Sequence, residues 1–351
     1  MKSLKDYSLN ISEEEYHALP YWNHSTIARY AREGFSSLAT LHDPVQTTPS
    51  MEFGSLFDSI ITKGTEFVEK TYTVYDRPVP EAEKKVLEEL NRISTVKTFK
   101  DIPFSEVIFA ADTVGYQTRW KPETRYEKIK VYSDYFDTLA SGKKVISSKD
   151  WQDAMDMTYA LRSNPYTGNL FGLEDTQDIE YLYQMKFVVE YMLDNEKEVM
   201  IKFMPDLVVV NHKEKTIQPV DLKTSFAPAY DFKDNFLKYR YDVEAMLYAD
   251  GLELVRDKIK VECPEYEEYI ILPYIFVDIS RSDMQPVSYV YDQTDPSQYY
   301  GLSFSNGEKT YNYKRWDAIL EEILEYEETQ AKVPNNIKID KPNNILDFLG
   351  R

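Results

Sequence analysis

Residues 204–223, MPDLVVVNHKEKTIQPVDLK, decide the fold. Pro205-Asp206 comes before a run of valines, and Asp221-Leu222-Lys223 ends a second apolar stretch. The polar, turn-forming residues 211–215 separate the two. This pattern predicts a β-hairpin with one acid on each strand. Asp221 and Lys223 are two residues apart, so their side chains leave the same face of the second strand.

Two carboxylates and a lysine at this spacing predict a site for a hard cation. Mg2+, or Mn2+, takes carboxylate oxygens and keeps several waters, so Asp206 and Asp221 suffice to hold one ion. Such an ion activates a bound water and neutralises charge on a scissile phosphate. Lys223 would position that water or stabilise the transition state. The alternative is a surface hairpin with an Asp–Lys ion pair, but the preceding Pro-Asp and the helix expected after the hairpin favour the metal site.

These residues also resemble a known family. Pro205-Asp206 followed by Asp221-Leu222-Lys223 resembles the signature of the PD-(D/E)xK nucleases. The stretch that continues through Thr224 resembles the RecE (exonuclease VIII) branch of phages and prophages, in which D-x-K-T precedes a helix with a Y-x-x-Q-x-x-x-Y pattern. In this chain that pattern is filled, with Glu in place of the usual Gln, by Tyr241, Glu244 and Tyr248.

The resemblance implies an α/β fold with a restriction-endonuclease-like core, a mixed central sheet flanked by helices and an N-terminal helical extension. It also implies that this helix lines the active site, where the Gln-type position contacts DNA or supports Lys223. An ionised Glu244 cannot donate a hydrogen bond. It would bind a second metal ion or pair with Lys223 or Arg240. The alternative is that Tyr241 and Tyr248 pack on the sheet.

Two further acids are candidate metal ligands by the same resemblance. Glu180 begins a predicted strand where RecE-like proteins often carry an additional acid. Asp58, four residues after Gly54, takes the place of the histidine in a G-x-x-x-H motif. Glu180 as an exposed strand residue and Asp58 as a polar-face helix residue are the alternatives. The missing histidine leaves the number and identity of the metal ions open.

The pattern of the remaining chain predicts the order of elements. A helical N-terminal segment over 1–50 is expected to pack on a nuclease domain over 51–330, followed by a tail over 331–351. Pro219 predicts an edge position or a bulge near the site, because proline cannot donate to a ladder. The core is predicted to consist of strands at 179–193, 198–210 and 216–225, a helix at about 232–256 and a strand at 268–279.

Composition limits the classes of protein. The net charge is -19, which argues against a non-specific nucleic-acid binder but leaves a nuclease with local cations possible. A single cysteine, Cys263, excludes a disulfide framework, an iron–sulfur cluster and a cysteine-based zinc site. No apolar run has the length of a membrane span, and the N-terminus lacks a secretion signal, so a cytoplasmic location without membrane contact is expected. The cations nearest the site in sequence are Lys186, Lys202, Lys223, Lys233, Lys238 and Arg240.

Together these observations predict a metal-dependent deoxyribonuclease, a double-strand-end exonuclease of phage recombination. The resemblance implies a homo-oligomer and a single-strand annealing protein as partner. One alternative is a RecB-like endonuclease or nickase. Another is a catalytically inactive phage protein that uses the nuclease fold as a binding module, which the acidity of the chain and the changes at Asp58 and Glu244 favour.

Overall fold

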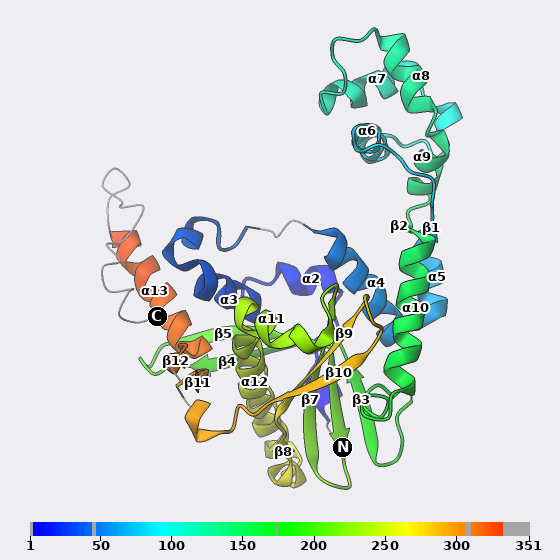
Figure 1. The fold of residues 1–351 in the computed structure, drawn as a ribbon. Helices are drawn as coiled ribbons and strands as arrows, with labels where there is room; N and C mark the ends of the chain where they lie inside the picture. Colours follow the sequence, from blue (N-terminus) through cyan, green and yellow to red (C-terminus); the bar gives the residue numbers. More distant parts are fainter. Residues whose placement is uncertain (1–2, 44–46, 173, 299, 306–309, 333–351) are drawn as a thin grey trace. The chain divides into compact units, whose positions relative to one another are not determined.

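The computed structural model describes residues 3–43, 47–172, 174–298, 300–305 and 310–332 (Figure 1). The predicted tail therefore lies outside the described residues from 333 onward. Contacts divide the chain into two compact units. We call Met1–Thr48 with Tyr159–Arg351 the sheet unit, and Pro49–Thr158 the helical unit. Sequence patterns alone did not separate the helical unit from the predicted nuclease domain, whose boundaries stay a prediction.

The main sheet of the sheet unit is mixed, which confirms the coarse fold class. Its strands lie in the order β10-β9-β7-β6-β3, and β8 also pairs with β7. β7 is antiparallel to β6, with Leu207 opposite Val220, and parallel to β9, with Asp221 opposite Phe276. The strands span β3 Ile179–Tyr183, β6 Leu207–Asn211, β7 Thr216–Ser225, β8 Ile270–Ile271, β9 Tyr274–Ser280 and β10 Pro286–Tyr291.

Two predicted strands are each divided in the structure. The stretch 179–193 forms β3 and then β4 (Phe187–Met192), and 198–210 forms β5 (Glu198–Phe203) and then β6. β4 and β5 pair only with each other as a separate antiparallel sheet among the described strands. The breaks coincide with Gln184, whose φ of 48° is left-handed, and with Pro205. Gln184 N–H donates to the Asp206 carbonyl at 3.0 Å, so the two breaks face each other beside Asp206.

The expectation that Pro219 marks an edge strand is wrong, because β7 is paired on both sides. Pro219 lies opposite Val208 of β6. On the other side, β8 pairs with Thr216 and Ile217, and β9 begins its pairing at Val220. Pro219 therefore lies in the short gap between β8 and β9, where no strand would accept a hydrogen bond from the N–H that proline lacks. The Gln218 side-chain amide fills this gap by donating to the Pro273 carbonyl at 2.6 Å.

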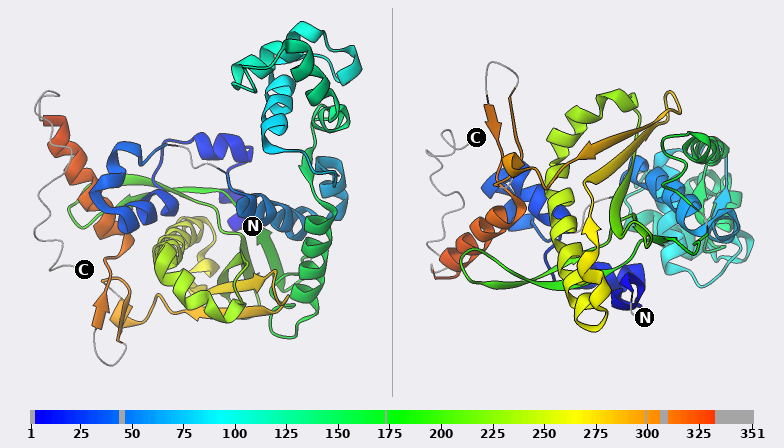
Figure 2. Two further views of the ribbon diagram at one scale, coloured as in Figure 1. Left: turned by 45° about the horizontal axis from the view of Figure 1, so that its top comes forward. Right: turned by 90° about the horizontal axis from the view of Figure 1, so that it is seen from below.

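The predicted helix at 232–256 is also divided. α11 (Phe232–Tyr239) ends at Arg240, which adopts the left-handed conformation with φ 59° and ψ 51°, and α12 (Tyr241–Glu262) starts there in a new direction. α12 packs against α3 and α13 and against the β4–β5 hairpin, as Figures 1 and 2 show. Its buried face shares one core with the main sheet, and that core includes Ile27, Leu182, Phe203, Leu247 and Trp316.

The N-terminal segment belongs to the sheet unit and is tied to β5. The Lys202 side chain of β5 is buried, and its ammonium donates to the carbonyls of Tyr16, His17 and Leu19 at 3.1, 2.9 and 2.7 Å. Lys202 therefore caps the end of α2 rather than standing free for a phosphate. The other elements of this unit are α1 Leu4–Tyr7, α2 Glu13–Ala18, α3 His24–Glu33, β11 Ser303–Ser305, β12 Thr310–Asn312 and α13 Trp316–Lys332.

The helical unit has a core of its own, in which Val86, Leu87, Val107 and Phe136 are buried together. Two short strands of this unit, β1 and β2, pair in parallel. α10 begins in this unit and runs past its boundary into the sheet unit. Its elements are α4 Pro49–Lys63, α5 Thr65–Thr71, β1 Tyr72–Val74, α6 Glu81–Ile93, α7 Phe104–Thr113, α8 Pro122–Lys130, α9 Ser133–Leu139, β2 Lys144–Ile146 and α10 Ser148–Ser163.

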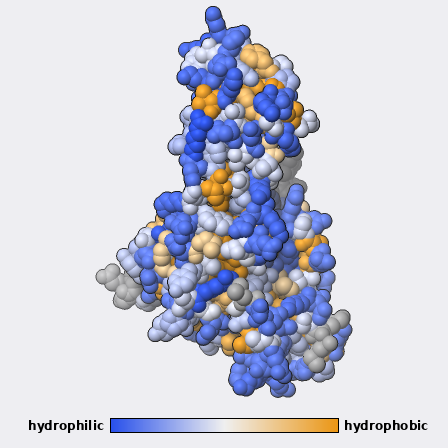
Figure 3. All heavy atoms as spheres, turned by 90° about the vertical axis from the view of Figure 1, so that its right-hand side faces the viewer, coloured by the Kyte–Doolittle hydropathy of each residue, from blue (hydrophilic) through white to orange (hydrophobic). Residues whose placement is uncertain are grey.

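The face of the molecule drawn in Figure 3 is mostly hydrophilic. On the face drawn in Figure 3, apolar residues form small separate groups among charged and polar ones. Of the helices in the described part of the chain, none combines the length and the apolar character needed to cross a bilayer.

Candidate functional site

The Lys223 ammonium lies between two buried carboxylates. It is 2.8 Å from an oxygen of Asp221 and donates a hydrogen bond to Glu244 at 2.9 Å. Asp221 and Lys223 come from β7, and Glu244 comes from the first turn of α12. Asp221 and Glu244 are 2% and 4% exposed, while the Lys223 side chain keeps 21% of its surface exposed. The pairing predicted for Glu244 with Lys223 is therefore present.

An aromatic floor fixes the direction of the lysine. Lys223 Nζ lies 4.5 Å from the centre of the Tyr241 ring, which stacks on Phe276 at 5.8 Å. Phe276 stands opposite Asp221 in the parallel β7–β9 register, so its ring faces the same side of the sheet. A cation over an aromatic face is attracted by the ring quadrupole. Tyr241 thus packs on the sheet and supports Lys223 at the same time.

Asp206 joins this group from the neighbouring strand. Its carboxylate accepts a hydrogen bond from the Leu222 backbone N–H at 2.9 Å. Leu207 is paired with Val220, so Asp206 is placed beside Asp221 at the end of the β6–β7 ladder. Its charge is among those that raise the pKa of Lys223. The structure therefore brings Asp206, Asp221 and Lys223 together.

The electrostatics of the site show an excess of negative charge. Burial, and after it the charge of Glu244, raise the pKa of Asp221 to about 7 even though Lys223 opposes the shift. Burial by itself would lower the pKa of Lys223, but Asp221 and Glu244 together raise it well above its usual value. Lys223 consequently stays charged across the physiological range. One ammonium therefore faces more acid than it can neutralise.

His24 belongs to the site and was missed by sequence reasoning. Its Nδ1 lies 2.9 Å from the Tyr248 hydroxyl, and its Nε2 lies 3.6 Å from a Glu244 oxygen. Burial and the neighbouring Lys223 charge lower the pKa of His24 to about 3, so the imidazole is neutral although 28% of its side chain is exposed. No local signal could have found it, because it begins α3, 220 residues before Glu244, and only the fold joins them.

Tyr248 packs on the sheet, as the alternative reading expected, and also contacts His24. Its ring packs on the sheet, 5.7 Å from Phe203 and 6.3 Å from Tyr274 between ring centroids. Its hydroxyl bonds to His24. Tyr274 is a second residue that sequence reasoning did not find. It is fully buried, its hydroxyl has no hydrogen-bond partner, and burial together with the charges of Asp221 and Glu244 raises its pKa well above the usual value.

One predicted metal ligand, Glu180, is not brought to this group. Glu180 lies opposite Val210, whereas Asp206 directly precedes the other end of β6. Four residues of strand separate these levels by about 13 Å. One Glu180 oxygen instead lies 3.6 Å from His212. Asp58 lies on α4 in the helical unit, and its role as a ligand stays a prediction.

Arg240 and Thr224 occupy positions around the site with different surroundings. Arg240 is buried, forms a two-pronged ion pair with Asp242 at 2.9 Å for both bonds, and donates to the Lys314 carbonyl. These contacts stabilise the junction between α11 and α12. Thr224 is half-buried on β7 opposite Ile279, and as the neighbour of Lys223 it points to the other face of the sheet.

The carboxylates fit a hydrated divalent cation better than a cage made of protein ligands alone. Among the described residues, no group of three or more His, Cys, Asp or Glu side chains is arranged to hold a metal ion. Asp206 and Asp221 still offer carboxylate oxygens from adjacent strands. The buried Oδ2 of Asp221 accepts no aligned hydrogen bond, although Lys223 lies beside it. Mg2+ needs only one or two such carboxylates because it keeps most of its waters.

Comparisons with known proteins add little to this geometry. No family model and no curated protein matches the chain. Ten chains of solved structures match it. One of them, titled "Crystal structure of SSO0001", is 14% identical, covers 71% of this chain and 85% of its own, and has a TM-score of 0.26. A similarity at this TM-score carries no argument about fold or function.

Proposed function

We propose that the protein is a metal-dependent hydrolase of DNA phosphodiester bonds with a core of the PD-(D/E)xK, restriction-endonuclease-like type. The observation that carries the proposal is the convergence of Asp206, Asp221 and Lys223 at the end of the β6–β7 ladder. The order of the sheet supports the same reading, because the acid-bearing strand β7 lies between an antiparallel and a parallel neighbour.

In this proposal Asp206 and Asp221 hold Mg2+ or Mn2+. When bound, the ion would supply an activated water and charge neutralisation at the phosphate. Lys223 is the residue that positions the water or stabilises the phosphate oxygens. Its side chain is more exposed than those of Asp221 and Glu244, with which it pairs at 2.8 and 2.9 Å. Glu244 and Tyr241 position Lys223 through the hydrogen bond and the ring contact.

The resemblance narrows the proposal to an exonuclease that acts on double-strand ends in phage recombination. A homo-oligomer and a single-strand annealing partner would accompany that role. A RecB-like endonuclease or nickase would use the same residues on different DNA. The two are distinguished by the substrate, since an end-dependent enzyme degrades linear duplex and leaves covalently closed circles intact.

The test compares cleavage of labelled linear duplex and closed circular DNA by the full-length protein with Mg2+, with Mn2+ and with a chelator. Cleavage that needs the metal and is lost in Asp221→Asn and Lys223→Met is the expected result. Asp178→Asn and Lys213→Ala, both exposed, are the matched controls and retain activity. Thermal melts of each variant show whether it is folded. A folded wild-type protein that is inert on both substrates with both metals overturns the proposal.

One observation favours a second candidate, a binding module without catalysis. Asp221 and Glu244 are almost fully buried, and Lys223 already pairs with both of them. In that case the cluster is a buried ion pair that orients α12 on β7. The cleavage assay together with a mobility-shift assay separates the two candidates, because a binding module binds DNA with a chelator present but gives no products when metal is added.

A further inference from the structure

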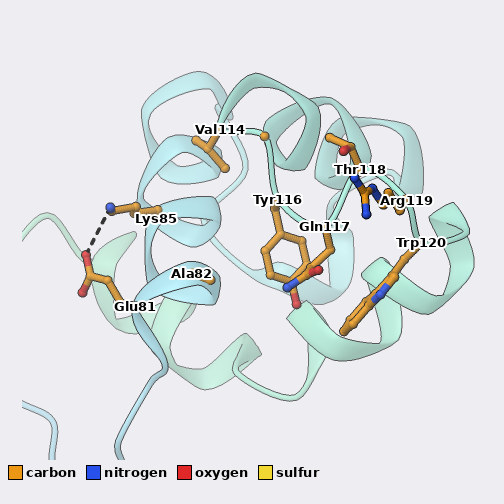
Figure 4. Close-up of a pocket in the computed structure, with 10 residues that line it drawn as sticks. Glu81, Ala82, Lys85, Val114, Tyr116, Gln117, Thr118, Arg119 and Trp120 are labelled. Atoms are coloured by element: carbon orange, nitrogen blue, oxygen red, sulfur yellow. Dashed lines mark ion pairs between the residues drawn. The ribbon is translucent and has the colours of Figure 1, made fainter.

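We propose that the helical unit carries a second, separate site that binds a nucleotide of a single-stranded polynucleotide. A pocket of ≈ 820 Å³ lies between α6 and the loop that joins α7 to α8 (Figure 4). That volume is within the range of small-ligand sites. The walls contain an indole, a phenol, two cations, an amide and a hydroxyl. They are formed by Glu81, Ala82, Lys85, Val114, Gly115, Tyr116, Gln117, Thr118, Arg119 and Trp120.

The loop wall of the pocket is fixed from behind. The Tyr116 ring is buried, and its hydroxyl donates to Glu83 of α6 at 2.9 Å. The buried Arg125 donates to Asp112 at 2.6 Å and to the Tyr116 carbonyl at 3.4 Å. Gly115 and Gln117 adopt left-handed φ values of 69° and 42°, which turn the chain on both sides of Tyr116. A preformed wall lowers the entropy lost when a ligand binds.

The exposed side of the pocket offers a stacking surface next to a cation. Trp120 is 40% exposed, and its ring stands edge-on to Tyr116 at 6.4 Å between centroids. Figure 4 shows Tyr116 and Trp120 projecting from the loop to the same side. Arg119, adjacent in sequence, carries a planar guanidinium suited to phosphate oxygens. Nucleobases stack on such aromatic faces whatever their sequence.

The pocket lining carries a net positive charge, from Lys85 and Arg119 against Glu81. Lys85 lies 3.8 Å from Glu81, a long ion pair between two exposed side chains on the α6 side. Arg119 is the other cation of the lining, on the loop side. Residues 117–130 contain five Lys or Arg and two Glu in a chain whose net charge is -19. Arg125 is buried and paired with Asp112, so it does not face a ligand. The exposed cations of the segment, which are the ones a phosphate backbone can reach, are Arg119, Lys121, Lys128 and Lys130.

A single strand fits these features better than the other anionic polymers. An acidic peptide would use the cations but has no flat ring to place on Trp120. A duplex keeps its bases stacked on each other, so it cannot offer a base face without unpairing. Gln117 and Thr118 add donors and acceptors that suit the edge of an exposed base. The proposal goes beyond the hydrolase, because binding here requires neither the β7 residues nor a metal ion.

The experiment measures binding of a fluorescein-labelled oligodeoxythymidylate of about 12 nucleotides to the full-length protein by anisotropy, with a chelator present. Trp120→Ala is expected to weaken binding roughly 10-fold, the loss typical of one stacked base. Trp120→Phe retains most of the affinity, because it keeps an aromatic face. Arg119→Glu weakens binding more than Lys128→Glu, which makes the same charge change at an exposed position outside the lining. Tyr166→Ala, at an 84% exposed aromatic residue of the sheet unit, leaves binding unchanged.

Competition with unlabelled polymers identifies the feature that is bound. An abasic strand, a duplex of equal length and polyglutamate are expected to compete at least 10-fold less well than the oligonucleotide, since none presents a base face. An RNA strand of the same length tells whether the sugar matters. Equal binding by Trp120→Ala and Tyr166→Ala, or equal competition by the abasic strand, overturns the proposal. Asp221→Asn separates this outcome from failure of the hydrolase, because it is expected to bind the strand normally while losing cleavage.

Discussion

At the scale of single residues, the site is organised by the Lys223 ammonium, which pairs with carboxylates from two elements. Lys223 links β7 to α12 through Asp221 and Glu244, and the Tyr241 ring closes its third side. Buried charges are tolerated when they are paired in this way. Burial, and after it the charge of Glu244, raises the pKa of Asp221 although Lys223 opposes the shift.

Replacing Glu244 by Gln separates the charge of this residue from its hydrogen bond. The Gln oxygen still accepts from Lys223, but the negative charge that raises the pKa of Asp221 is gone. The pKa of Asp221 should therefore fall, and the acidic limb of the cleavage rate should shift to lower pH by about one unit. The measurement is the rate from pH 5 to pH 9. Glu190→Gln, an exposed acid of β4, leaves the limb unchanged; an identical profile for Glu244→Gln would contradict the assigned coupling.

Asp278 should make stability depend on pH. It is 1% exposed, and burial raises its pKa to about 7 from 3.8. The folded state thus binds a proton more tightly than the unfolded state. The stability this gives is complete below the unfolded pKa and is lost as pH rises through 7. Asn mimics the protonated form, so Asp278→Asn should match the wild type near pH 4 and exceed it by up to about 4 kcal/mol at pH 8.

Urea unfolding at several pH values measures this difference. Asp178→Asn, an exposed acid, is the control and should follow the wild type throughout. Asp221 titrates in the same direction in both proteins, so it cancels when the two curves are subtracted. A constant difference between wild type and Asp278→Asn across the range would show that Asp278 is ionised in the folded protein at all these pH values.

Residue patterns predicted the part of the site that lies on neighbouring strands. Alternation along a strand puts Asp221 and Lys223 on one face, and the hairpin puts Asp206 beside them. The same rules could not predict that His24 and Tyr274 join the site or that Glu180 lies far from Asp206, because these depend on which elements the fold brings together. Sequence spacing also gave no sign that Lys202 is buried against α2.

At the scale of elements, two breaks give the site its shape. The turn at Gln184 and Pro205 separates β3–β6 from β4–β5 and leaves Asp206 at the start of β6. The left-handed Arg240 ends α11 and lets α12 begin with Tyr241 and Glu244 in its first turn. Apolar periodicity predicted these strands and helices but ran through both breaks. Hydrophobic pattern reports burial, and here burial continues across a change of direction.

Arg240→Ala should destabilise the protein strongly. Asp242 is fully buried, and its carboxylate takes both of its charged hydrogen bonds from Arg240. Removing the partner of a buried charge costs about 3–5 kcal/mol. Lys238→Ala, an exposed cation two residues away, should cost less than 1 kcal/mol. Urea unfolding measures both. Adding Asp242→Asn to Arg240→Ala should recover part of the loss, because it removes the unpaired charge; no recovery would mean that the cost arises elsewhere.

Gly251→Ala should also destabilise, although alanine favours helices. Gly251 lies in the middle of α12, and a Cβ there would overlap the Phe203 ring of β5. Alanine gains about 1 kcal/mol of helix propensity, against about 1–3 kcal/mol for overpacking. The net loss should be about 1 kcal/mol by urea unfolding. Phe203→Leu combined with Gly251→Ala should cost less than the sum of the two single changes; simple additivity would place the clash elsewhere.

At the scale of the whole molecule, each of the two compact units has a buried apolar cluster of its own in the described part of the chain. Leu87 lies in the core of the helical unit, and Leu247 lies in the core of the sheet unit. Calorimetry should therefore show two transitions. Leu87→Ala should move one transition to lower temperature and Leu247→Ala the other. Each substitution should lower the free energy of unfolding of its unit by about 2–5 kcal/mol, because both leucines are fully buried. If both variants shift a single common transition, the two units unfold together.

The contact of Lys202 with the carbonyls of Tyr16, His17 and Leu19 has a consequence for shortened forms of the chain. A protease that cut the chain after residue 22 would remove all three carbonyl acceptors of the buried Lys202 ammonium, and the bridge between Trp22 and Ile201 as well. The clipped molecule would keep every acid of the β6–β7 hairpin. It would nevertheless be a target for cellular quality control, because the strand that the missing peptide had covered would carry a buried ammonium without its acceptors.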